Sequence, residues 1–434
     1  RYEIMTRIFS STKFWKVLIL AKPCKRFPLS VVYVLLFALC WFASMLKTEY
    51  HWNIAISTFD ITMVFLASAM FASTGMTKLA SIVEGKRKVK MWNIATQVFL
   101  ISEWAYIYWQ DSIHILHVST PYALVLTSIA SVALFPVIGK CKDQILWNNA
   151  KKLFLDLLIA VCSAAGVSMC LVIAFCLLYV PLSLMTDLKC PTLLLKVIGL
   201  ILPFVFCMFD FLRREPTGKK LTSIKEKVSE FQDYHKMLLG LFAYAILVMY
   251  LYMLIILFSF ELPRGYISLI CSILTGFGLL CYIIVANTKV NETGKTWKSI
   301  HSHIPLLLLP LQLLITIAIG RRIIDYGVTI QRCYIVLLNL WSYAVCIYLI
   351  VRKGNNLRWI PISFIVTYFI FTATPLSCSN YVLWQLKTDI RAFLNHKKNI
   401  FSRGIPVDKY DYLIQEYGSA AVNEFKDIEK YRSE

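Results

Sequence analysis

The sequence predicts an all-α integral membrane protein that crosses a bilayer about eleven times. Of its 434 residues, 58% are hydrophobic and only 16% are charged, whereas roughly 25% of residues are charged in soluble chains. Apolar runs near the ~20 residues that a membrane helix needs recur along nearly the whole length. The net charge of +20 does not indicate a nucleic-acid partner, because the basic residues lie in short runs between apolar segments.

Four segments follow one another along the chain. They are a basic cytoplasmic N-terminal segment (1–28), a polytopic transmembrane domain (29–376), an interfacial amphipathic helix (377–403) and an extracytoplasmic soluble tail (404–434). The expected spans are 29–46, 54–72, 94–109, 121–139, 155–180, 192–212, 238–260, 266–286, 304–320, 333–351 and 359–376. In the amphipathic helix, Leu386, Ile390 and Leu394 recur every four residues and share one face. The tail begins a helical region too short to hold its own core.

Lysine and arginine are distributed very unevenly between alternate connections. Twenty-nine lie in the segments 1–28, 73–93, 140–152, 213–236, 287–303 and 352–358, against six in the intervening segments. Cytoplasmic loops of membrane proteins are the basic ones, so the N-terminus is predicted to be cytoplasmic. With an odd number of spans, the tail is predicted to be extracytoplasmic. Half of the six outer basic residues fall in one segment, 320–332, which we call the outer hairpin.

The outer hairpin is the first candidate site, with the side chains Arg321, Arg322, Asp325, Tyr326 and Arg332. Asp325 follows Arg321 by four residues and Arg322 by three, so either pair can meet on one helical face. Gly327 suits a helix C-cap and Thr329 an N-cap. One interpretation is a tight turn at the membrane surface, in which Asp325 neutralises one arginine and Arg332 either caps a helix or snorkels to the interface. The other is an anion site for a lipid headgroup or a substrate phosphate.

Ionisable residues inside the predicted spans form the second candidate set: Asp60, Glu103, Asp156 and Asp210. A charge at the bilayer centre costs about 2.5–3.5 kcal/mol on insertion scales, so such residues usually face the bundle interior or water. Asp60 and Glu103 are therefore candidates for a proton or cation path. In the alternative interpretation, Asp60 bonds to neighbouring hydroxyl groups and Glu103 lies close enough to the interface to reach water.

Cysteine and motif patterns favour a protein without a catalytic centre. Most of the thirteen cysteines lie in apolar runs, where cysteine behaves as a small hydrophobe. Cys190, Cys333 and Cys378 fall near the predicted outer face, where a disulfide can form if that face is oxidising; unpaired thiols are the alternative. No metal-ligand spacing, nucleotide-binding loop or hydrolase motif is present in the sequence. We therefore expect no metal and no cofactor.

Two elements carry a resemblance to a known family. The first reads Leu-Pro-Arg-Gly-Tyr-Ile-Ser over 262–268, and the second Arg-Ile-Ile-Asp-Tyr-Gly-Val-Thr-Ile-Gln-Arg over 322–332, with Trp341 nine residues later. Together they resemble an uncharacterised bacterial membrane family, the domain of unknown function 4153, most specifically over 238–376. Cys333 stands where that family commonly has a tyrosine. The resemblance implies a bacterial cytoplasmic membrane location and a chain that continues beyond Glu434.

Three classes of function are compatible with these patterns. The first is a non-catalytic inner-membrane component of an envelope complex, acting as an anchor, scaffold or regulator. Its partners would be membrane lipids and other envelope proteins bound through the tail, with no nucleic acid. The second is an ion-coupled transporter or channel that uses the intramembrane acids. The third is a membrane enzyme acting on lipid-linked phosphates through the outer arginines.

Overall fold

All regular structure in the described part of the chain is helical, as the sequence predicts. The computed structural model describes residues 21–50, 56–82, 86–112, 116–117, 119–138, 143–185, 192–217, 232–259, 267–286, 295–352, 357–395, 404–418, 422 and 425. The chain divides into two compact units, Arg1–Ile224 and Lys225–Glu434. The division falls within the transmembrane domain that the sequence predicts over 29–376.

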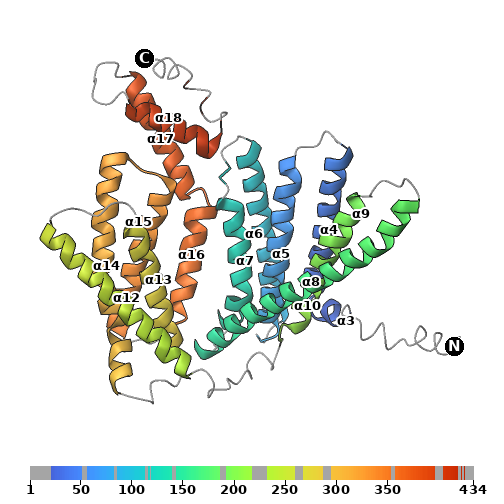
Figure 1. Ribbon diagram of the computed structural model, residues 1–434, viewed down its shortest axis with the longest axis horizontal. Helices are drawn as coiled ribbons and strands as arrows, with labels where there is room; N and C mark the ends of the chain where they lie inside the picture. Colours follow the sequence, from blue (N-terminus) through green and yellow to red (C-terminus); the bar gives the residue numbers. More distant parts are fainter. Residues whose placement is uncertain are drawn as a thin grey trace. The chain divides into compact units, whose positions relative to one another are not determined.

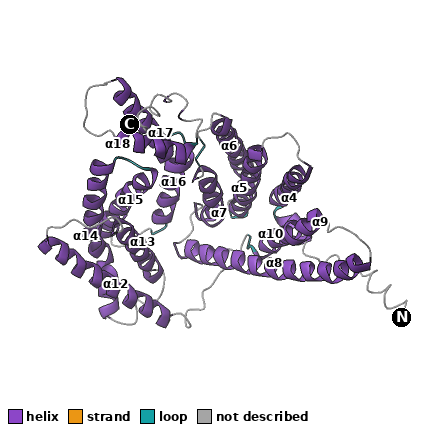
Figure 2. Cartoon of the chain, turned by 45° about the horizontal axis from the view of Figure 1, so that its top comes forward, coloured by secondary structure: helices purple, strands orange, loops and turns teal. Residues whose placement is uncertain are grey.

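The first unit is built around one central helix, α5 (Ile56–Ala80). Helices α4 (Pro28–Tyr50), α6 (Lys86–Ser112) and α7 (Ser119–Ile138) pack against it (Figures 1 and 2). The 43-residue α8 (Asp143–Met185) packs on α7 and α10 (Leu202–Arg214), and the short α3 (Ala21–Arg26) and α9 (Thr192–Lys196) flank them. Buried side chains from α4, α5, α7, α8 and α10, including Phe71, Val132 and Phe211, form one core.

Helices α5 and α7 approach each other closely because small residues line their contact. A β-carbon built on Gly75 would lie 2.9 Å from the backbone oxygen of Ser131. Ala69, Ala72 and Ser73 of α5 are also buried. Small side chains let helix backbones come together where lipid, rather than water, surrounds the bundle.

A proline reshapes the helix that leads into α10. Pro203 has no N–H to donate to the carbonyl four residues earlier, and its ring crowds that carbonyl. The preceding segment, Val197–Ile201, is a π-helix (η1). The freed carbonyl oxygen of Gly199 instead accepts a hydrogen bond of 2.7 Å from the Ser168 hydroxyl of α8. A neighbouring helix thus satisfies the backbone group that the proline leaves open.

The second unit contains α12 (Gln232–Ser259), α13 (Ile267–Ala286), α14 (Lys295–Tyr326), α15 (Ile330–Arg352), α16 (Trp359–Ala373), α17 (Cys378–Asn395) and α18 (Gly404–Tyr417). Its core includes Phe242, Leu308 and Val345. Polar groups also join α14 to α15. The amide of buried Asn339 donates to the Thr316 hydroxyl at 2.7 Å, and the amide of Gln312 donates to the Cys346 sulfur at 3.2 Å. Such interhelical bonds are typical of membrane bundles.

Eight of the described helices are long and apolar enough to cross a membrane. They correspond to eight of the predicted spans, so the count of eleven is not confirmed. The other three predicted spans, 94–109, 238–260 and 266–286, lie on α6, α12 and α13. Within the residues whose side chains the structure describes, the apolar stretches of α12 and α13 cover Gly240–Ile255 and Ile270–Ile283. Large apolar side chains on the outside of the helices, such as Leu177 at 70% exposed, fit a lipid-facing surface.

Candidate functional site

The candidate site is a group of charged side chains at the end of α5 and α10. Helix α5 does not stop near residue 72, where the sequence predicts its end, but continues to Ala80. Lys78 therefore lies inside the bundle, completely buried, instead of in a cytoplasmic loop. Glu215 follows the last residue of α10 and is 1% exposed.

Lys78 connects three helices through its ammonium group. The Nζ atom of Lys78 lies 2.6 Å from Oε2 of Glu215 and donates a hydrogen bond of 2.9 Å to Oδ1 of Asn149 in α8. The Asn149 amide in turn donates to the backbone oxygen of Ala133 in α7 at 2.9 Å. We call Lys78, Asn149 and Glu215 the buried charge cluster. It joins α5, α7, α8 and the end of α10 at one point.

The buried charge cluster is not fully satisfied among the described residues. The second carboxylate oxygen of Glu215, Oε1, is buried and has no hydrogen-bond partner there. Burial raises the pKa of the Glu215 carboxyl above its ordinary value, while the positive charge of Lys78 acts in the opposite direction. An unpaired buried oxygen lowers the stability of a fold by about 1–3 kcal/mol. Glu215 Oε1 therefore either destabilises the protein or binds a water molecule or a proton.

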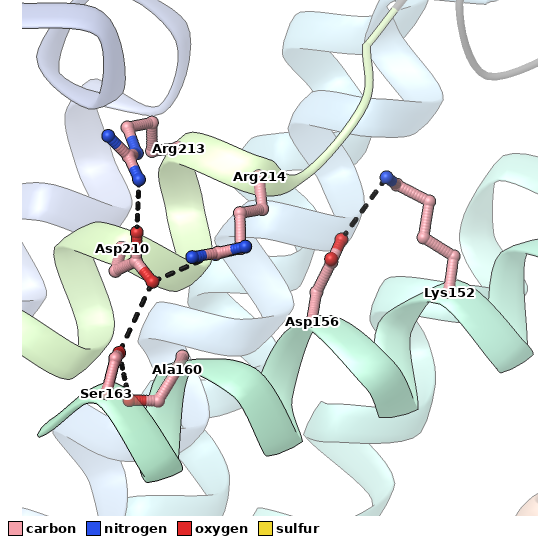
Figure 3. Close-up of polar contacts among 7 residues, drawn as sticks. All are labelled: Lys152, Asp156, Ala160, Ser163, Asp210, Arg213 and Arg214. Atoms are coloured by element: carbon pink, nitrogen blue, oxygen red, sulfur yellow. Dashed lines mark hydrogen bonds and ion pairs between the residues drawn. The ribbon is translucent and has the colours of Figure 1, made fainter. Parts of the chain in front are cut away.

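Asp210, one of the predicted acids, is held by its own helix. Its carboxylate accepts hydrogen bonds from Arg213 at 2.7 Å and Arg214 at 2.9 Å, and the Ser163 hydroxyl of α8 lies 3.4 Å away (Figure 3). The spacings of three and four residues put both guanidinium groups on the face of Asp210. The carboxylate is buried at 3% exposure, whereas both arginines are partly exposed. Asp210 is thus a neutralised acid at the end of α10.

Asp156, a second predicted acid, lies about two turns before Ser163 on α8. Its Oδ2 atom is 3.5 Å from Nζ of Lys152 and makes no hydrogen bond within the described chain (Figure 3). Asp156 and Lys152 both act electrostatically on Glu215. The structure therefore brings Asp156 close to the buried charge cluster.

The other two predicted acids lie elsewhere. Asp60 is exposed on α5, and its 18-residue separation from Lys78 corresponds to about 27 Å along a helix. Glu103 is half-buried on α6, and its Oε2 atom has no partner among the described residues. Among the described residues, no hydrogen bond or ion pair joins either acid to the buried charge cluster, so the described structure shows no continuous path through these groups.

Sequence reasoning found Asp156 and Asp210 but missed Lys78, Asn149 and Glu215. One signal was available for Lys78. Met76 and Leu79, three residues apart, continue a helical apolar pattern past residue 72, although Ser73, Thr74 and Gly75 lower the local hydropathy. Glu215 lies in a basic, proline-containing connection and carries no comparable signal.

The outer hairpin forms the turn that the first interpretation describes. Gly327 ends α14 with φ +76°, and its N–H donates to the Ile323 oxygen at 2.9 Å. Thr329 caps α15, since its hydroxyl accepts from the Arg332 N–H at 3.4 Å. Both cap predictions are confirmed. Arg332 also donates to the Gly327 oxygen at 2.6 Å.

The two remaining arginines of the outer hairpin, Arg321 and Arg322, differ in whether they form an ion pair. Arg321 and Asp325 form the predicted pair at 3.5 Å, and both side chains are about half exposed. Arg322 is partly buried and makes no ion pair with the residues that the structure describes. The backbone of Tyr326 ends α14, and its side chain lies outside the described atoms. The anion-site interpretation needs at least one arginine of the outer hairpin without an ion pair, and among the described residues Arg322 meets that condition.

Helix α18 docks on the outer hairpin and on α17. The Tyr412 hydroxyl accepts from the Ile330 N–H at 3.2 Å, and the Tyr417 hydroxyl donates to the Ser379 oxygen at 2.5 Å. Lys409 pairs with Asp389 of α17 at 2.5 Å. Leu413 is completely buried. The tail is expected to be too short for its own core, and its described helix α18 packs instead on the preceding elements.

Replacing Gly327 by alanine is expected to destabilise the protein by about 1–2 kcal/mol, because a β-carbon disfavours the left-handed conformation. Gly320→Ala in the preceding helix α14 is the matched control, because a β-carbon there meets nothing within 4 Å and alanine favours helix by about 1 kcal/mol. The melting temperatures of the two variants in detergent should shift in opposite directions. A rise for both variants would contradict the described turn.

No protein-family model, curated protein or solved structure matches the chain. The fold and the site by themselves define a class: an all-helical chain with several long apolar helices, which fits a polytopic membrane protein. Within the described residues, no group of three or more His, Cys, Asp or Glu side chains is arranged to hold a metal ion.

Proposed function

We propose that the chain is a non-catalytic, multi-pass component of the bacterial cytoplasmic membrane that anchors or regulates an envelope complex. The observation that carries this proposal is the use of the buried charges. Lys78 joins α5 to α8 and to the end of α10, and Asp210 is neutralised by Arg213 and Arg214. Buried charges that hold helices together in this way favour the function of a rigid scaffold.

The docked C-terminal region supports the same proposal. Helices α17 and α18 are tied together by the Lys409–Asp389 pair and the buried Leu413, and α18 contacts the outer hairpin. This gives the chain an ordered polar element beside its apolar helices, as an anchoring protein requires. The bacterial location and the extracytoplasmic side of the tail rest on the family resemblance and on the predicted charge bias.

Ion-coupled transport is the second candidate, and one observation favours it. Glu215 Oε1 and Asp156 Oδ2 are both buried without a hydrogen-bond partner in the described chain, and the two groups interact electrostatically. Buried acids of this kind commonly line proton paths in membrane proteins. The enzyme alternative has less support, because Asp325 pairs with Arg321 and the Gly327 carbonyl engages Arg332.

Purification in a mild detergent, followed by native mass spectrometry, tests the leading proposal. We expect a partner subunit retained in fixed stoichiometry. Leu413→Asp, which disrupts the buried contact of α18, should lose this partner, whereas Gln415→Asp on the exposed side of the same helix should keep it.

Transport by the chain without a partner would contradict the scaffold proposal. A protein that purifies alone and that drives ion-dependent solute uptake in liposomes would overturn the scaffold proposal in favour of transport. Loss of that uptake in Glu215→Gln, with retention in Gln415→Asp, would then assign the transport to the buried charge cluster.

A further inference from the structure

Two thiols meet between α15 and α17. Cys333 lies in the first turn of α15, and Cys378 is the first residue of α17. Their side chains are in hydrogen-bonding contact, and both cysteines are free thiols. Helices α15 and α17 pack against each other, so the contact belongs to an interface between two elements that are far apart in sequence.

The backbone around each thiol is held in place. The Cys333 N–H donates to the Thr329 oxygen at 3.0 Å, which fixes Cys333 in the capped first turn. At the other thiol, the Tyr381 N–H donates to the Ser377 oxygen at 3.0 Å. Helix α18 reinforces both sides, because Tyr412 bonds to Ile330 and Tyr417 bonds to Ser379. The two segments that carry the thiols are therefore held in place against each other.

A cavity lies beside the pair. It has a volume of about 450 Å³ and is lined by both cysteines together with Leu376, Tyr381 and Trp384. These three side chains are between 49% and 70% exposed, whereas Cys378 is 3% exposed. Cys333 is only partly buried. A reagent that enters the cavity thus meets Cys333 more readily than Cys378.

We propose that Cys333 and Cys378 form a dithiol site that closes to a disulfide by exchange with a small disulfide-bonded donor. The Cys333 thiolate attacks one donor sulfur and expels a donor thiolate, giving a mixed disulfide. The Cys378 thiolate then attacks Cys333 Sγ and expels the second donor thiolate. The two protons from the cysteines go to the two donor thiolates. The protein loses two electrons, and the donor disulfide gains them.

The disulfide would fix α17 to α15 and, through the contacts of α18, to the outer hairpin. A covalent bond at this interface restricts local opening of α17. The third cysteine predicted on the outer face, Cys190, lies outside the described residues, and its participation is an outcome of the test. Cys346 is a suitable control, since it is completely buried in α15 and its sulfur accepts a hydrogen bond from Gln312.

Thiol mapping of the full-length protein in detergent tests this proposal. The reduced protein is incubated with oxidised glutathione, alkylated with N-ethylmaleimide, digested and analysed by mass spectrometry. We expect a linked Cys333–Cys378 peptide that disappears on reduction, with loss of alkylation at these two positions and no change in the labelling of Cys346. Amide exchange across α17 should be slower in the oxidised than in the reduced protein.

Variants identify the order of reaction. Cys378→Ser should stop at a glutathione adduct on Cys333, and its α17 exchange should no longer respond to oxidation. Full alkylation of both cysteines in the wild-type protein after glutathione treatment would overturn the proposal, as would a link from either cysteine to Cys190. The wild-type measurement alone decides the matter if a serine variant fails to fold, and it does not depend on any partner subunit.

Discussion

Replacing Lys78 by methionine is expected to lower the stability of the protein by about 3–5 kcal/mol, the cost of removing one partner of a buried ion pair. Methionine has a similar length and fills the space of the lysine stem, so the change removes the charge with little loss of volume. Glu215 then keeps a buried carboxylate without the ammonium group at 2.6 Å. Thermal unfolding in detergent, followed by circular dichroism or a thiol-reactive dye, measures the effect.

Two further variants separate the pairing from general packing. Lys78→Met combined with Glu215→Gln removes both charges and should recover more than half of the lost stability. Lys152→Met is the matched control, because Lys152 is 36% exposed and lies 3.5 Å from its acid. Its expected cost is smaller than that of Lys78→Met, because Lys152 is partly exposed to solvent and its pairing with Asp156 is longer. Equal melting temperatures for Lys78→Met and Lys152→Met would show that the buried charge cluster does not form as described.

Replacing Gly75 by valine is expected to destabilise the first unit by about 2–3 kcal/mol through overpacking. The new β-carbon would lie 2.9 Å from the Ser131 oxygen and 3.1 Å from the Phe135 ring. The Ser131 oxygen belongs to the backbone, so this clash is relieved only if α5 and α7 move apart. The same thermal unfolding assay measures the loss.

Gly166→Val in α8 provides the control for helix propensity. Gly166 is also helical, but a β-carbon there meets nothing within 4 Å. The intrinsic change from glycine to valine in a helix is the same at both positions and favours valine by a few tenths of a kcal/mol. The difference between the two variants therefore reports the packing of α5 on α7. A difference near zero would argue against the close approach of these helices.

Local chemistry made parts of this structure predictable. The caps of the outer hairpin followed from Gly327 and Thr329, because the positive φ of Gly327 and the hydroxyl acceptor of Thr329 are properties of a few adjacent residues. The pairing of Arg321 with Asp325 followed from their spacing on one helical turn. Asp156 and Asp210 were identified because acids inside apolar runs are conspicuous in the sequence.

The rest of the candidate site depended on contacts between helices. Lys78 and Glu215 are 137 positions apart, and hydropathy assigned Lys78 to a loop because small polar residues precede it. Whether two distant side chains meet depends on how their helices are rotated and how closely they approach, and the small residues of α5 and α7 set that approach.

The sequence by itself determined that the chain is helical, largely apolar and suited to a membrane, because these properties are sums over many residues and follow from the period and length of the apolar runs. Only the tertiary structure decided that Lys78 is a buried structural cation, that Cys333 meets Cys378, and that α18 docks on the outer hairpin. Each of these results is a single contact between elements distant in sequence, and composition and periodicity carry no information about which faces of those elements meet.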